Sequence, residues 1–272
     1  MRSRWGLLAL WVIGAIWMAG IPAAAAEKSK AEVLGAACEH LVEVLNEKDL
    51  TALFGMMEKM KEAGLSWNKE LTLPVSGIVA CKTPEELYVL WGMYAIDMTY
   101  AHLFGKGFED IVAARVELED RIGFPRDAFK KPVPESDREE KKNKSIEMIH
   151  EMIRQSQENP VLLHTFVGGF YGSTLELFYL FCSLGLAAGV TDQVTDLINS
   201  HIPQLDLTYQ ILDAYEENGE LAQLLDVGGR KAVIQSIMDV VKASLGNVRE
   251  EDLQKVLSVV EPVRAPLKAP CQ

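Results

Sequence analysis

Basic residues are scarce in this chain of 272 residues. It has 27 lysines and arginines against 39 aspartates and glutamates, so its formal net charge at pH 7 is −12. Removal of the first 26 residues, which contain two arginines and no acid, would make the charge more negative. Such a surface repels phosphate backbones and anionic lipid headgroups. We therefore expect neither nucleic-acid binding nor binding to an anionic membrane surface.

Recognisable catalytic motifs are also missing. The sequence has no HExxH, GxSxG, Walker loop, dinucleotide-binding glycine pattern or EF-hand loop. Its five histidines are scattered, and no two of them are four residues apart. Short methionine-rich and histidine-containing stretches fit the apolar faces of helices better than metal sites. We predict no metal site and no cofactor.

Long apolar runs are few, and the first marks an export signal. Residues 1–26 combine Arg2 and Arg4 with an apolar stretch and a small-residue Ala24-x-Ala26 cleavage site, which is typical of a secretory signal peptide. The stretch is shorter than a membrane-spanning helix. No cysteine lies at the cleavage region, which argues against a lipid anchor. We expect a periplasmic product, residues 27–272, with no stable membrane insertion after cleavage.

Only four cysteines are present, and none forms a CxxC pair. Their wide spacing excludes CxxC-type redox, haem and zinc motifs. In an oxidising compartment they allow two disulfides with three possible connectivities. Cys182 lies in an apolar stretch and fits a buried core position. Cys271 could attach the C-terminal tail to the body, and Cys81 is the partner that we take as a hypothesis.

Helical periodicity dominates the remaining sequence, and we predict an all-α fold. The expected architecture is a single-domain bundle of about eight to nine helices with two central apolar helices. Residues 71–82 are the one place where a short strand or extended loop fits. Thr83, Pro84 and Glu86 predict a capped helix start. The proline-rich residues 262–272 are expected to form a tail. The predicted helices cover 31–46, 48–63, 84–104, 108–121, a stretch that follows the charged residues 135–145 and ends near Asn159, 161–186, 191–212 with a kink at Pro203, 229–245 and 248–260.

Two apolar helices, 87–104 and 161–186, each have a stripe of small residues. Small residues at helical spacing let two backbones approach closely. We therefore predict that these helices form the central pair and touch along the stripes. The second helix could nearly span a bilayer, but His164 and Glu176 count against insertion. The two stripes are Tyr88, Gly92, Ala95, Thr99 and His102, and Thr165, Gly169, Gly172, Glu176, Tyr179 and Ser183.

Each central helix contains one lone acid, Asp97 or Glu176. Asp97 falls on the bulky face, where an ionised carboxylate is costly unless it is paired or hydrogen-bonded. The favoured interpretation is an anchor to a neighbouring helix end or loop, and a large stability loss in Asp97→Asn would support it. The alternative is an acid with a raised pKa in a pocket, with His102 as a further catalytic candidate. The candidate ligand-binding residues are Tyr94, Asp97, Tyr100, Tyr171 and Glu176.

Residues 92–100, GMYAIDMTY, preceded by LPV at 73–75, match the pattern G-[VM]-Y-x-x-D-[LM]-x-Y. A G-G-F sequence at 168–170 and a later glutamate, Glu176, precede an aromatic stretch. With these motifs the chain resembles a family of secreted helical proteins, many of them lipoproteins, from Gram-negative envelopes. This chain departs from that family in lacking a lipobox cysteine. The resemblance implies a helical fold and an envelope location, and it implies no activity.

Three function classes fit the sequence. The first is a non-catalytic periplasmic helical binding or interaction protein of the cell envelope. The second is a carrier that holds an apolar small molecule or lipid in an interhelical cavity. The third is a hydrolase-type enzyme that uses Asp97 and Glu176. The expected partner is an envelope protein or an apolar small molecule.

Overall fold

The computed structural model describes residues 30–46, 59–126, 138–216 and 223–271. The predicted signal peptide lies outside these residues, as do most of the predicted helix 48–63 and most of the loop 124–134. The all-α prediction is confirmed, and nine helices of eight or more residues occur in the described ranges. The helices are α2 (Lys30–Asn46), α3 (Lys59–Glu62), α4 (Pro84–Leu103), α5 (Glu109–Ile122), α7 (Arg138–Gln155), α8 (Pro160–Ala188), α9 (Asp192–Asn199), α10 (Ile202–Glu216), α12 (Val227–Ala243) and α13 (Glu250–Lys268).

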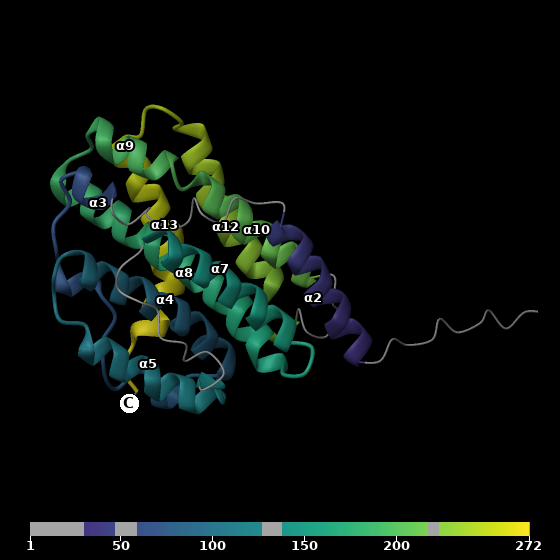
Figure 1. Cartoon of the computed structure of the whole chain (residues 1–272). Helices are drawn as coiled ribbons and strands as arrows, with labels where there is room; N and C mark the ends of the chain where they lie inside the picture. Colours follow the sequence, from purple (N-terminus) through teal and green to yellow (C-terminus); the bar gives the residue numbers. More distant parts are fainter. Residues whose placement is uncertain (1–29, 47–58, 127–137, 217–222, 272) are drawn as a thin grey trace, which may run out of the picture.

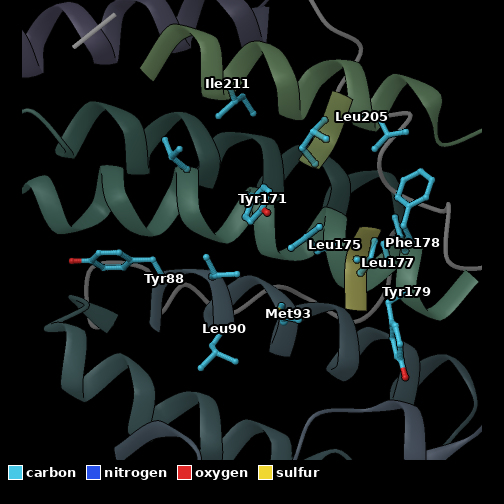
Figure 2. Packing of buried hydrophobic residues seen from close by; sticks show 14 of the residues in the cluster. Tyr88, Leu90, Met93, Tyr171, Leu175, Leu177, Phe178, Tyr179, Leu205 and Ile211 are labelled. Carbon is cyan, nitrogen blue, oxygen red and sulfur yellow. The ribbon is translucent and has the colours of Figure 1, made fainter. Parts of the chain in front are cut away.

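Helix α8 runs through the middle of the bundle (Figure 1). It packs against α4, α7, α9, α10 and α13. Figure 2 shows buried side chains of α8, with Leu90 and Met93 of α4 on one side and Leu205 and Ile211 of α10 on the other. In the described part of the chain, α8 alone is long and apolar enough to cross a membrane, but 72% of its most apolar window is buried inside the protein. The protein packing therefore accounts for most of its apolar surface.

The start of α4 follows from its first four residues. The Thr83 hydroxyl accepts a hydrogen bond from the Glu86 amide (3.3 Å), and the Glu86 carboxylate accepts one from the Thr83 amide (2.8 Å). Pro84, at the first helical position, has no amide hydrogen that needs a partner. The predicted capping box is therefore confirmed.

Close contact between α4 and α8 depends on glycines, as predicted. A Cβ atom on Gly92 would overlap the carbonyl oxygen of Gly169, and one on Gly172 would overlap the carbonyl oxygen of Val89. The Ser173 hydroxyl also donates to the Gly92 carbonyl oxygen (3.1 Å). Along the whole contact, Tyr88 lies beside His164 and Asp97 beside Glu176, so the two helices are parallel.

Only two of the five residues of the predicted α4 stripe, Tyr88 and Gly92, are buried in this contact. Thr99 and His102 are exposed, and Ala95 is half-buried. Asp97, which the helical wheel placed opposite the stripe, instead meets Glu176 of α8. Packed helices cross at an angle, so the contacting face rotates along each helix and a straight stripe leaves the interface.

Replacing Gly92 with alanine is expected to lower the free energy of unfolding by about 1–3 kcal/mol, because the added methyl group forces two backbones apart. Gly35 in α2 is the matched control, since a Cβ there meets nothing within 4 Å. Gly35→Ala should be neutral or stabilising, because alanine favours helix more than glycine does. Urea unfolding of both variants measures the difference, and equal effects would contradict this account of the helix contact.

Of the two alternatives predicted for residues 71–82, the structure has the loop and not the strand, with bends and the 3₁₀ segments Lys69–Leu71 and Val79–Cys81. Two other sequence-based predictions of secondary structure are wrong. The helix predicted to kink at Pro203 is two helices, α9 and α10, because a proline fits the first turn of a new helix. The final helix starts after Arg249, not Asn247, and continues to Lys268.

The extension of α13 through Pro262 and Pro266 replaces most of the predicted tail. Each proline removes one amide donor from the helix. Both prolines are exposed, so water can reach the backbone on that face. The opposite face is buried through Val260, Arg264 and Leu267. Packing of that face against α8 stabilises a helix that local propensity alone disfavours.

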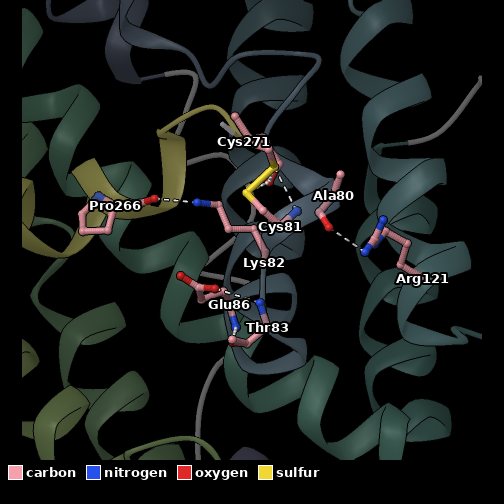
Figure 3. Close-up of a disulfide and its surroundings, with 9 residues drawn as sticks. Ala80, Cys81, Lys82, Thr83, Glu86, Arg121, Pro266 and Cys271 are labelled. Carbon is pink, nitrogen blue, oxygen red and sulfur yellow. Dashed lines mark hydrogen bonds between the residues drawn. A yellow bond between two sulfur atoms is a disulfide. The ribbon is translucent and has the colours of Figure 1, made fainter.

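The structure contains the predicted disulfide between Cys81 and Cys271, whose Cα atoms are 5.5 Å apart (Figure 3). The same region is held by a hydrogen bond from the Cys271 amide to the Gly77 carbonyl oxygen (2.6 Å). The Lys82 amine donates to the Pro266 carbonyl oxygen (2.7 Å). Cys38 and Cys182 are free and buried. The end of the chain is thus fastened to the segment before α4.

Candidate functional site

Three polar side chains of α4 hold the segment 66–74. Tyr94, Asp97 and Tyr100 are three residues apart, so they share one buried face of the helix. Each forms a hydrogen bond with a backbone group of that segment, whose backbone is not paired in a β-sheet. The bonds run from Tyr94 Oη to the Pro74 carbonyl oxygen (2.7 Å), from the Leu73 amide to Asp97 Oδ2 (2.8 Å), from Tyr100 Oη to the Ser66 carbonyl oxygen (3.0 Å) and from the Asn68 amide to Tyr100 Oη (2.8 Å).

Glu176 of α8 is paired with Arg264 of α13 by two hydrogen bonds. Arg264 Nε donates to Oε2 and Nη2 donates to Oε1, each at 2.7 Å. Nη2 also donates to the Leu71 carbonyl oxygen (2.6 Å), and the guanidinium carbon lies 3.8 Å from the ring centre of Tyr179. Glu176 is 0% exposed and Arg264 1%. This buried ion pair joins α8, α13 and the segment 66–74.

Asp97 belongs to the same cluster. Its carboxyl group is 0% exposed, and Glu176 of α8 is the neighbouring negative charge. Burial and the negative charge of Glu176 raise the pKa of Asp97 well above its ordinary value, against the opposing effects of the Leu73 amide and Arg264. Oδ1 of Asp97 is buried, and no donor reaches it. We call Asp97, Glu176 and Arg264 the acid cluster.

The other predicted site residues lie elsewhere. His102 is exposed near the end of α4, and its ring packs edge-on against Phe108 (5.7 Å between centres). Tyr171 is buried in α8, with the Arg230 guanidinium carbon 5.2 Å from its ring centre. Burial raises the pKa of the Tyr171 hydroxyl. The structure therefore brings together four of the five predicted ligand-binding residues, Tyr94, Asp97, Tyr100 and Glu176, but not Tyr171.

Arg264 is the residue that sequence reasoning missed. It lies in residues 262–272, the predicted proline-rich tail, where a core side chain is not expected. A signal was present, because Val256 and Val260 are spaced by four residues and Arg264 continues that spacing. An arginine at the next position of an apolar stripe indicates a buried guanidinium with an acidic partner.

The geometry of the acid cluster favours a structural role for Asp97 and Glu176 over a catalytic one. Both carboxyl groups are buried, and the polar groups around them bond the backbone of this chain. A substrate could reach Asp97 or Glu176 only after the segment 66–74 or α13 moved away. Within the described ranges no group of three histidine, cysteine, aspartate or glutamate side chains could hold a metal ion.

Comparison with known proteins gives no relative from which a role could be transferred. No protein-family model, no curated protein and no solved structure matches this chain.

Proposed function

We propose that the protein is a non-catalytic helical binding or interaction protein of the periplasm, with an envelope protein as its partner. The observation that supports this most is the burial of both candidate acids at 0% exposure, within bonds to their own chain. Groups used in this way stabilise a scaffold and do not meet a substrate. The signal-like residues 1–26 and the resemblance to envelope proteins support the compartment.

Contact positions for a partner can be sought among exposed apolar side chains. Large apolar residues that form a contiguous patch on the surface often mark the site where a partner binds. Each exposed apolar residue can be tested separately. In the described residues the most exposed is Leu245, at 64%, just after α12. The others are Val75, Val116, Met148 and Leu224.

The test is site-specific photo-crosslinking in the native host. A photoreactive residue replaces Leu245, Met148 or Val116, and exposed Gln254 in α13 gives a control position. We expect one apolar position, and not the control, to yield a discrete adduct with an envelope protein that also binds the purified chain. Mass spectrometry of the exported protein should show an N-terminus at Glu27.

Two outcomes would overturn the proposal. A stoichiometric lipid that co-purifies with the native protein would favour a carrier. A hydrolytic activity that Asp97→Asn abolishes without loss of fold would favour an enzyme.

A further inference from the structure

The acid cluster has two carboxyl groups and one cation. Arg264 uses Nε and Nη2 on Glu176, and Nη2 also reaches the Leu71 carbonyl oxygen. Two ionised carboxylates at 0% exposure would leave one negative charge without a counter-charge in the core. Burial of an unpaired carboxylate is so unfavourable that such a group takes up a proton instead.

The bonding of Asp97 leads to the same result by a separate route. Oδ2 accepts from the Leu73 amide, and no donor reaches Oδ1. Asp97 therefore has a buried oxygen without a donor and a second carboxyl group, Glu176, as its neighbour, and two carboxyl groups can hydrogen-bond to each other only if one of them carries a proton. The Glu176 oxygens already accept from Arg264, so Glu176 is the ionised partner.

We propose that Asp97 is protonated in the folded protein and donates to Glu176, so that the acid cluster is a proton-dependent clamp. The clamp holds the segment 66–74 and α13 against the two central helices. The proton that closes the clamp lies on Oδ1 of Asp97. Loss of that proton places two negative charges side by side, and they repel each other across the contact between α4 and α8.

The groups that face Asp97 from each neighbouring element are consistent with this assignment. From α8 comes Glu176, whose partner Arg264 stacks on the ring of Tyr179. From α13 comes Arg264, the one cation that acts on Asp97 among the described residues. From α4 itself, Tyr94 and Tyr100 donate their hydroxyl protons to backbone carbonyl oxygens, not to Asp97.

The pH dependence has a defined sign. Below about pH 4, Asp97 is protonated in both the folded and the unfolded protein, so its contribution to stability is complete. As the pH rises, the unfolded chain ionises first because the folded pKa is raised. The contribution therefore falls with rising pH until the folded protein also loses the proton, and there the clamp opens.

The main test compares Asp97→Asn with the wild-type chain. Asparagine mimics a protonated aspartate, since its oxygen can accept from Leu73 and its amide can donate to Glu176. We expect the ratio of the wild-type to the variant unfolding constant to rise by about tenfold per pH unit above about pH 5. Chemical denaturation between pH 4 and pH 9 measures it. A variant that is most destabilised at neutral pH and recovers at pH 4 would overturn the proposal.

Asp252→Asn is the matched control. Burial acts to raise the pKa of Asp252, but the Arg249 amide, Lys255 and the Arg249 guanidinium together lower it below its ordinary value. Its contribution is therefore complete above about pH 4 and lost below, so the same ratio should stay flat between pH 5 and pH 9. If the ratio rises equally for Asp97→Asn and Asp252→Asn, the pH dependence does not come from the proton on Asp97, and the proposal is refuted.

A direct measurement follows the proton itself. With ¹³C-labelled aspartate and Asp97→Asn for assignment, the carboxyl carbon signal of Asp97 should not move near pH 4, where an ordinary aspartate titrates. The Leu73 amide should lose protection from hydrogen exchange at the pH where that signal does move. A titration near pH 4 would refute the protonated aspartate, and unchanged Leu73 protection would refute the clamp.

Discussion

Replacing Arg264 with methionine is expected to lower the free energy of unfolding by about 3–5 kcal/mol, because it leaves the buried Glu176 without its cation. Methionine keeps much of the side-chain volume but removes both hydrogen bonds to the carboxylate. Urea unfolding at neutral pH measures the loss.

A matched control comes from the same helix. Arg249, at the start of α13, pairs with Glu251 and Asp252, and its own side chain is more than half exposed. Arg249→Met should cost no more than about 1 kcal/mol, as is typical of a surface pair. The double change of Arg264 and Glu176 to methionine should recover much of the loss, since no buried charge then remains. A single Arg264 variant as stable as the wild type would show that the cluster does not stabilise the fold.

Removal of the disulfide by Cys81→Ser with Cys271→Ser is expected to cost about 2–5 kcal/mol. The bond closes a loop with a sequence separation of 190 residues, so it restricts much of the unfolded chain. The cost in a reducing buffer should match that of the double variant. Cys38 and Cys182 should contribute nothing to this difference, since both are free thiols in the folded protein.

The disulfide and the acid cluster should act together on the end of the chain. Arg264 and Cys271 both fasten the C-terminal region to residues 71–81. Loss of the disulfide should therefore make Arg264→Met more harmful than the sum of the two separate costs. Additive costs in a double-mutant cycle would show that the two links are independent.

At the acid cluster, sequence reasoning identified Asp97 as the important group but not the neighbour on which its protonation depends. The apolar helix predicted a hydrogen-bonded Asp97 that anchors a loop, and the Leu73 amide is such a partner. An ionised anchor would make Asp97→Asn strongly destabilising. The neighbouring Glu176 reverses that expectation, because a protonated aspartate is well replaced by asparagine. The two acids are 79 positions apart in the chain, and no local pattern indicates that they meet.

Periodicity and capping signals by themselves determined the all-α fold, the position of most helices and the approach of α4 and α8 through glycines. These properties depend on residues within a few turns of one another, so they can be read locally. Only the tertiary structure decided that α13 continues past its two prolines and that Arg264 enters the core. It also decided which of the two acids pairs with the buried cation, because the contacts of Arg264 with Glu176 and Leu71 join parts of the chain that meet only after folding.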